Sequence, residues 1–100
     1  MKTERRSNKR LNEQIGAMFE NEACQVLNIS ERGVLLQLNH PTMFLGIEKC
    51  IDFDLQLDGQ WIRLRGKVEW IHDELALSRL GLSVQDAPSL YFDFLRKRLE

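Results

Sequence analysis

The sequence predicts an all-β domain: a six-stranded antiparallel β-barrel followed by a C-terminal α-helix. Apolar and polar residues alternate with period two along most of the chain, the pattern of strands with one buried and one exposed face. The dipeptide Asp58-Gly59 separates two such runs and favours a two-residue hairpin turn. Apolar residues at the three- to four-residue spacing of a helix begin only after Pro88. Six short strands with no helix between them indicate a small barrel.

The first three strands are expected before residue 39. Ile15, Ala17 and Phe19 alternate with other residues, and Glu20-Asn21-Glu22 then breaks the pattern. The loop at 39–47 contains a proline and a glycine, which end strands. The expected strand ranges, in chain order, are 15–19, 24–29, 33–38, 50–57, 61–71 and 78–84.

The hairpin at 50–71 has the clearest pattern. Its polar residues, including Asp52 and Asp54, alternate with apolar ones, so one face of each strand is expected to be buried. The predicted inward side chains are those of Ile51, Phe53, Leu55, Leu57, Ile62, Leu64, Val68 and Trp70, and the predicted outward ones are those of Arg63, Arg65, Lys67 and Glu69.

The last segment changes to helical spacing. Leu90, Tyr91, Phe94 and Leu95 are apolar at this spacing, after an expected Asp86 cap and an early proline, and cations follow in the last turn. The predicted organisation is an N-terminal arm at 1–11, a barrel at 12–86 and a helix at 87–100 that covers an end or face of the barrel.

The charge is unevenly distributed. The formal net charge is -1, but residues 1–10 carry five cations and one anion, leaving nine cations and fourteen anions in the rest. A uniformly basic surface for a nucleic-acid polymer is therefore not expected. No signal peptide or membrane-spanning run is evident. Cys24 and Cys50 are predicted to be buried, reduced thiols of a cytoplasmic protein, and His40 and His72 lack the spacing of a metal site.

The sequence shows no set of residues expected to catalyse a reaction. Asp52 and Asp54 occupy solvent-facing strand positions with no histidine partner in the pattern. Ser30 lacks the preceding glycine of a nucleophile elbow, and no Gly-Lys-Ser/Thr phosphate loop is present. We therefore expect a binding protein rather than an enzyme, with no cofactor and no metal.

Two polar motifs remain. The first, RRSNKR, contains Arg6 and Arg10 in RxxxR spacing, and alone it could be a solvated arm. The second, NISERG, runs from Asn28 through Ser30 to Gly33, and alone it could be an ordinary tight turn between two strands. Their order and separation on a barrel pattern are more specific than either motif.

This pair of motifs resembles the PilZ domain, a bacterial receptor module for cyclic di-GMP. The family pattern is RxxxR followed by (D/N)xSxxG, and KVEW and RLGLSV are similar to its later strands. The resemblance covers nearly the whole chain. It implies a six-stranded barrel with a following helix, and cyclic di-GMP as the ligand.

The resemblance also implies the site residues. Arg6 and Arg10 are expected to contact phosphate and guanine, because a guanidinium donates paired hydrogen bonds and stacks on bases. Asn28 and Ser30 would donate or accept short hydrogen bonds, and Gly33 would give the turn backbone freedom and permit close approach. Arg5, immediately before RxxxR, is expected to admit a second, stacked ligand molecule. Arg32 lies at a variable position of the second motif.

The expected signal is an ordering of the arm on ligand binding, read by a downstream protein that the sequence does not identify. Two alternatives stay open. One is a PilZ-like adaptor that binds a protein and no nucleotide. The other is a small barrel that binds RNA or single-stranded DNA, since Trp61 shares a strand face with Arg63, Arg65 and Lys67.

Overall fold

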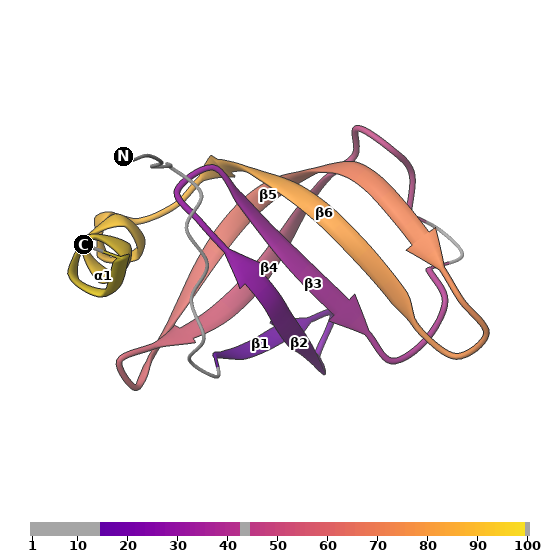
Figure 1. Cartoon of the computed structure of the whole chain (residues 1–100), viewed down its shortest axis with the longest axis horizontal. Coiled ribbons are helices and arrows are strands. Elements are labelled where there is room, and N and C mark those ends of the chain that lie inside the picture. The colour runs from indigo at the N-terminus through magenta and orange to yellow at the C-terminus, as the bar shows by residue number, and fades with distance from the viewer. Residues whose placement is uncertain (1–14, 43–44, 100) are drawn as a thin grey trace, which may run out of the picture.

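The computed structural model describes residues 15–42 and 45–99, which form six antiparallel strands and one helix (Figure 1). The strands close into a barrel in the order β1-β2-β3-β6-β5-β4. The predicted fold class is confirmed. The elements are β1 (Gly16–Phe19), β2 (Glu22–Ile29), β3 (Gly33–Leu38), β4 (Cys50–Leu57), β5 (Gln60–Asp73), β6 (Ser78–Asp86) and α1 (Ser89–Leu99).

Two hairpins of the barrel turn through residues with positive φ. Asp58 and Gly59 have φ of 52° and 78°, as the sequence predicted for the β4–β5 turn. Glu20 and Asn21, which only interrupted the alternation in the sequence, have φ of 53° and 66° and join β1 to β2. Positive φ at both positions matches the right-handed twist of the strands on either side.

The barrel interior is filled by the alternating apolar residues of all six strands. The inward residues predicted for the first strand and for β4 are buried, as are Leu80 and Leu82 of β6. Among the described residues, the buried apolar side chains are those of Ile15, Ala17, Phe19, Ile29, Val34, Leu36, Leu38, Ile51, Phe53, Leu55, Leu57, Ile62, Leu64, Val68, Leu80, Leu82, Tyr91, Phe94 and Leu95.

The prediction that Trp70 faces the core is wrong. On β5, Val68 pairs with Leu82 and Trp70 pairs with Gly81, so Glu69 is an extra residue that forms a β-bulge. A bulge reverses the alternation of faces beyond it. Trp70 therefore lies on the outer surface with 45% of its area exposed.

The two cysteines do not share one environment. Cys50 begins β4 on the outward face and is exposed, so the prediction that it is buried is wrong. Cys24 is half-buried, and this burial raises the pKa of its thiol to about 11. Both are free thiols.

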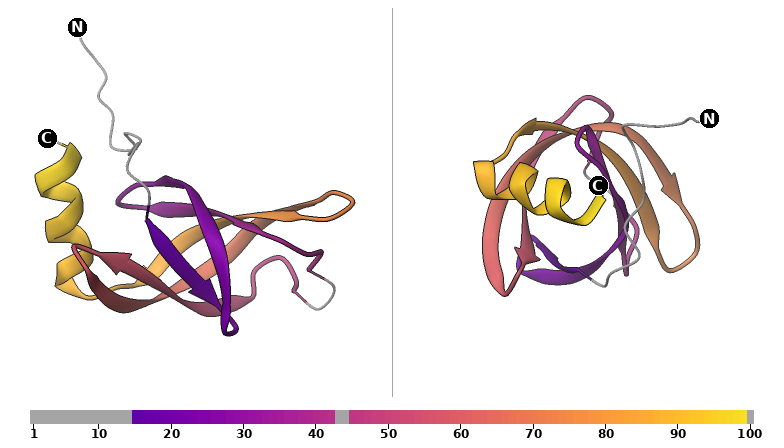
Figure 2. Two further views of the ribbon diagram at one scale, coloured as in Figure 1. Left: turned by 90° about the horizontal axis from the view of Figure 1, so that it is seen from below. Right: turned by 60° about the vertical axis from the view of Figure 1, so that its left-hand side comes forward.

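Helix α1 lies across one end of the barrel (Figure 2). Its buried residues are Tyr91, Phe94 and Leu95. Asp86 does not cap the helix, since it is the last residue of β6 and pairs with Arg65. No helix in the described part of the chain has the length and apolar character needed to cross a membrane.

Two polar contacts hold α1 to the barrel at well-separated points. The hydroxyl of Tyr91 donates a hydrogen bond to the main-chain carbonyl of Ser30, in the β2–β3 turn. The guanidinium of Arg98 pairs with Asp58 in the β4–β5 turn and lies 4.5 Å from the centre of the Phe94 ring. The helix is therefore attached to both turns at this end of the barrel.

Two leucine substitutions test how much the core contributes to stability. Leu36 is fully buried in β3, so Leu36→Ala should lower the free energy of unfolding by about 2–5 kcal/mol. Leu75 is fully exposed, so Leu75→Ala should change it by less than about 0.5 kcal/mol. Urea denaturation measures both values, and a similar loss in the two variants would contradict this description of the core.

Candidate functional site

The turn between β2 and β3 is closed by its own polar groups. The N–H of Ser30 donates to the carbonyl of Gly33 at 2.9 Å. The hydroxyl oxygen of Ser30 accepts hydrogen bonds from the N–H of Arg32 at 3.3 Å and of Gly33 at 3.2 Å. NISERG therefore forms the tight polar turn that its sequence indicated.

Ser30 organises this turn from a buried position. Only 8% of its area is exposed. Its hydroxyl is hydrogen-bonded within the turn and its carbonyl accepts from Tyr91, so both of its oxygens have partners in the protein. A direct contact between Ser30 and a ligand stays a prediction.

Gly33 permits a close approach between two strands of the barrel. The positive-φ glycine of the described chain is Gly59, so the backbone of Gly33 is not left-handed. A Cβ on Gly33 would lie 2.8 Å from the carbonyl oxygen of Leu82. Next to it, the N–H of Val84 donates to the carbonyl of Arg32 at 2.8 Å. The glycine thus lets the start of β3 approach β6 closely.

Asn28 stands on the outer face of the barrel beside this turn. Val26 pairs with Leu36 and Asn28 with Leu35, so Leu27 is an extra residue that forms a bulge in β2. The Oδ1 atom of Asn28 is buried, with no hydrogen-bond partner among the described residues. A buried acceptor without a partner is unfavourable and uncommon in folded proteins. Asn28 therefore presents an acceptor that a bound donor would satisfy.

Strand pairing places Asn28 in a row with three residues from other strands. We call Asn28, Leu35, Gly81 and Trp70 the outer row: Asn28 pairs with Leu35, Leu35 with Gly81, and Gly81 with Trp70. A Cβ on Gly81 would collide with the indole of Trp70, so the ring lies over this glycine. The row combines an apolar surface with the unpaired oxygen of Asn28.

Sequence reasoning missed three members of the outer row. Trp70 was assigned to the core because the bulge at Glu69 is not visible in the alternation, and Leu35 and Gly81 were given no functional role. A glycine inside a strand often marks a place where another group approaches closely. Gly81 was therefore a usable signal.

The predicted arginines Arg5, Arg6 and Arg10 lie outside the described residues. Among the described residues, Ser30 and Gly33 close one turn, and Asn28 lies beside that turn in β2.

A comparison with protein-family models decides the family. The model of the PilZ domain matches residues 4–95, a range that includes both RxxxR and NISERG. The chain belongs to the PilZ domain family. This family comprises receptors for cyclic di-GMP. A comparison with curated proteins gave no significant match.

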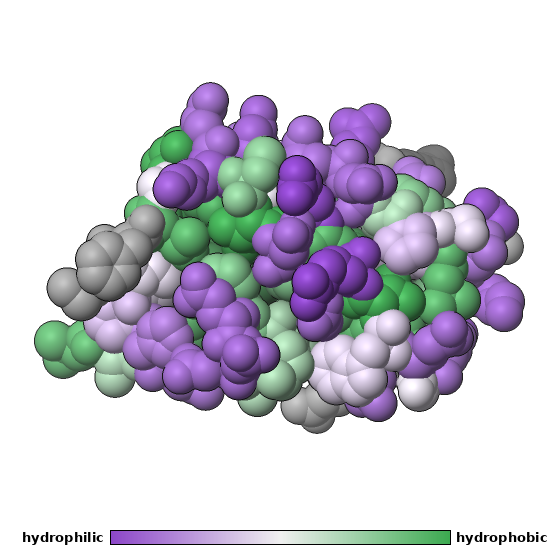
Figure 3. All heavy atoms as spheres, turned by 180° about the vertical axis from the view of Figure 1, so that it is seen from behind, coloured by the Kyte–Doolittle hydropathy of each residue, from purple (hydrophilic) through white to green (hydrophobic). Residues whose placement is uncertain are grey.

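The outer face of β4 and β5 in this PilZ domain carries a ladder of ion pairs. Arg63 Nε lies 2.9 Å from Asp54 Oδ1, and Arg65 Nε lies 3.0 Å from Asp52 Oδ1. The hydrogen bond from Arg65 holds the pKa of Asp52 below its ordinary value, so this carboxylate stays ionised. Figure 3, which views the molecule from behind, shows a mostly hydrophilic surface. The two aspartates thus pair with arginines, which agrees with the structural role expected from the sequence.

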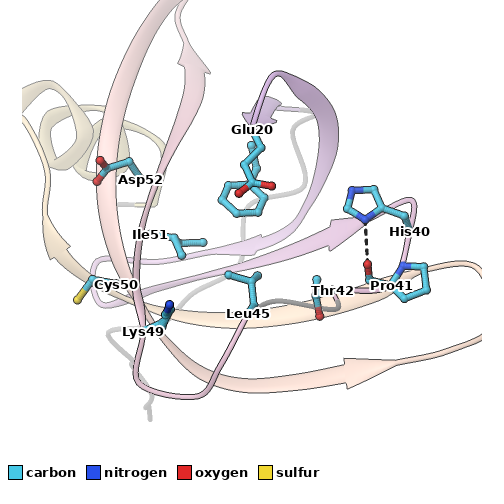
Figure 4. A pocket seen from close by; sticks show the side chains of 10 residues that line it. Glu20, His40, Pro41, Thr42, Leu45, Lys49, Cys50, Ile51 and Asp52 are labelled. Atoms are coloured by element: carbon cyan, nitrogen blue, oxygen red, sulfur yellow. Dashed lines mark hydrogen bonds between the residues drawn. The ribbon is translucent and has the colours of Figure 1, made fainter.

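A cavity of about 560 Å³ lies at the opposite end of the PilZ barrel from α1. Figure 4 shows it between the end of β1, the loop after β3 and the start of β4, with His40 Nδ1 3.0 Å from the carbonyl of Pro41. Of the predicted site residues that the structure describes, Asn28, Ser30 and Gly33, none lines it. Within the described residues, no group of three or more His, Cys, Asp or Glu could hold a metal ion. The turn and the outer row therefore form the candidate site.

Two glycine substitutions test the structural role of Gly33. Gly33→Ala would bring a methyl group against the Leu82 carbonyl, so it should lower the free energy of unfolding by about 1–3 kcal/mol. Gly46→Ala is the control, because a Cβ there has no atom within 4 Å and the backbone is not left-handed. Urea denaturation compares them. An unaffected Gly33→Ala would show that β3 and β6 do not need this close approach.

Proposed function

We propose that this PilZ domain binds cyclic di-GMP at the β2–β3 turn and the outer row, and signals to a partner protein. The observation that carries this proposal is the buried Oδ1 of Asn28, which no group in the described part of the chain contacts by a hydrogen bond. Asn28 lies in the family's second motif, beside a turn that is already held by its own hydrogen bonds, and in the same row as an exposed tryptophan. The site is therefore largely preformed on the barrel.

Asn28 and Trp70 suit a guanine base in complementary ways. A guanine edge carries N–H donors, including its N2 amino group, whereas the matching edge of adenine lacks that group. The Oδ1 of Asn28 needs a donor, so it favours guanine. The exposed indole of Trp70 offers an aromatic face on which a base can stack.

The phosphates would be bound by the arginines of the N-terminal arm. Arg6 and Arg10 can each donate two parallel hydrogen bonds to a phosphate or to the O6 and N7 atoms of guanine. Arg5 would contact a second, stacked ligand molecule, giving two per chain. The positive charge of residues 1–10 is the largest concentration of cations in the sequence, and two phosphates match it.

Binding would order the arm at 1–11 across the barrel and create a composite surface for the partner. Ordering costs about 1–2 kcal/mol per residue in backbone entropy, so several charge-assisted bonds are needed to offset it. We place the protein in the cytoplasm, where cyclic di-GMP is made, as a receptor without an enzymatic activity of its own.

Binding to a nucleic-acid polymer is less well supported by the structure. Trp61 and the arginines of β5 do share the outer face of the barrel, and Trp61 is 49% exposed. Arg63 and Arg65, however, are paired with Asp54 and Asp52. A polymer site depends on unneutralised positive charge along an extended surface.

Calorimetric titration tests the proposal directly. Cyclic di-GMP should bind more tightly than cyclic di-AMP, GTP or an oligonucleotide. Arg10→Ala or Arg6→Ala should weaken binding roughly 10- to 150-fold, because each removes hydrogen bonds to charged groups worth about 1.5–3 kcal/mol. Arg96→Ala, which removes an exposed arginine of α1, is the matched control and should bind as the wild type does.

Three results would contradict the proposal. Equal affinity for cyclic di-AMP would remove the role given to Asn28 in reading guanine. Wild-type affinity in Arg10→Ala would remove the role of the arm. Tight binding of an oligonucleotide with none of cyclic di-GMP would favour the polymer-binding alternative.

Asn28→Ala separates a ligand contact from a structural role. The Oδ1 atom has no hydrogen-bond partner among residues 15–42 and 45–99, so its removal should not lower the free energy of unfolding. Affinity for cyclic di-GMP should fall about fivefold, the effect of losing one neutral hydrogen bond of about 1 kcal/mol. Asn28→Asp keeps the acceptor oxygen and should retain more affinity. A loss of stability without a loss of affinity in Asn28→Ala would contradict the ligand contact.

A further inference from the structure

Tyr91 connects helix α1 to the candidate site through one hydrogen bond. Its side chain is fully buried, and its hydroxyl donates to the carbonyl oxygen of Ser30, 61 positions earlier in the chain. A carbonyl oxygen can only accept, so the tyrosine must be the donor. Burial raises the pKa of Tyr91 well above its ordinary value, which keeps the hydroxyl protonated.

Ser30 transmits this contact into the turn. The same residue that accepts from Tyr91 through its carbonyl also accepts from the N–H groups of Arg32 and Gly33 through its hydroxyl. The hydrogen bond from Tyr91 fixes the orientation of the Ser30 carbonyl. It therefore also fixes the start of the turn, in which the Ser30 side chain binds the amides of Arg32 and Gly33. Asn28 lies two residues before Ser30, near the end of β2.

We propose that Tyr91 is a positioning residue for cyclic di-GMP: without touching the ligand, its hydroxyl holds the Ser30 carbonyl and with it the geometry of the turn that receives the ligand. This inference rests on the proposed function. It makes helix α1 a supporting part of the binding site as well as a cover for the barrel. Preorganised groups of this kind improve affinity because less order has to be gained on binding.

The same contact couples the helix to the ligand in both directions. If docking of α1 strengthens ligand binding, then bound ligand must strengthen docking of α1 by the same factor. The helix ends in Arg96, Lys97 and Arg98 on the surface, so its state is accessible to another protein. The coupling gives a partner a second element, besides the arm, through which it can sense occupancy.

Tyr91→Phe tests the positioning role because it removes the hydroxyl and keeps the ring. In calorimetric titration with cyclic di-GMP, this variant should bind about three- to tenfold more weakly than the wild type, the range for one neutral hydrogen bond. Ile51→Val is the control. This substitution removes one buried methyl group from the start of β4, near the cavity at the other end of the barrel. The Ile51→Val variant should bind cyclic di-GMP as the wild type does, even if its melting temperature falls by as much as that of Tyr91→Phe.

Amide hydrogen exchange supplies a readout that general destabilisation would not reproduce. In the free protein, the amides of Arg32 and Gly33 should exchange faster in Tyr91→Phe and should be unchanged in Ile51→Val. A second measurement needs no variant: in the wild type, amides of Ser89–Leu99 should gain protection when cyclic di-GMP is added. If Tyr91→Phe does not fold, the exchange of the α1 amides in the wild type still tests whether the helix is coupled to ligand binding.

The outcomes separate this inference from the proposed function. Failure of the wild type to bind cyclic di-GMP would overturn both. Binding in the wild type that is equally tight in Tyr91→Phe, or a ligand that leaves the exchange of α1 unchanged, would overturn the positioning role of Tyr91 alone.

Discussion

The pairing of β3 with β6 is the contact on which the candidate site depends. These strands are not consecutive, and their pairing joins the hairpin of β2 and β3 to the sheet of β4, β5 and β6. It sets Gly33 against the backbone of Leu82 and places Leu35 beside Gly81, under the indole of Trp70. A side chain on Gly33 would force these strands apart. The turn and the tryptophan would then no longer lie on one surface, although the motif residues themselves would be unchanged.

The alternation of apolar and polar residues was enough to predict the strands, because burial on one face imposes period two on each of them. The turn at Asp58-Gly59 followed from its residue types. What the alternation could not show was the bulge at Glu69, since an extra residue in one strand is defined only by the strand it pairs with. The outward direction of the Trp70 side chain could therefore not be predicted from the sequence, although the glycine at position 81 was a signal of close approach on the neighbouring strand. The contact between Tyr91 and Ser30 could not be predicted from the sequence either, because it joins residues 61 positions apart that only the folded barrel brings together.

The charged residues of the barrel and of the N-terminal segment are distributed differently. On the outer face of β4 and β5, Arg63 and Arg65 are matched by Asp54 and Asp52 in neighbouring register. Residues 1–10 contain five cations and one anion, so the sequence of this segment does not supply enough anions to neutralise them. An exposed ion pair contributes little to stability, about 0–1 kcal/mol. Under the proposed function, these ion pairs would keep Arg63 and Arg65 from competing with the arm for the ligand phosphates.

The relative sizes of the interactions decide which element can act as the switch. One neutral hydrogen bond, such as that from Tyr91 to Ser30, contributes about 0.5–1.5 kcal/mol. Moving an equilibrium from 1:99 to 99:1 needs about 5.5 kcal/mol of differential binding. The helix contact alone therefore shifts a population by at most about tenfold, which is a modulation. Several charge-assisted bonds from Arg6 and Arg10, at about 1.5–3 kcal/mol each, reach the required size. If the protein signals by a nearly complete change of state, that change must be made by the arm, with α1 setting the affinity at which it occurs.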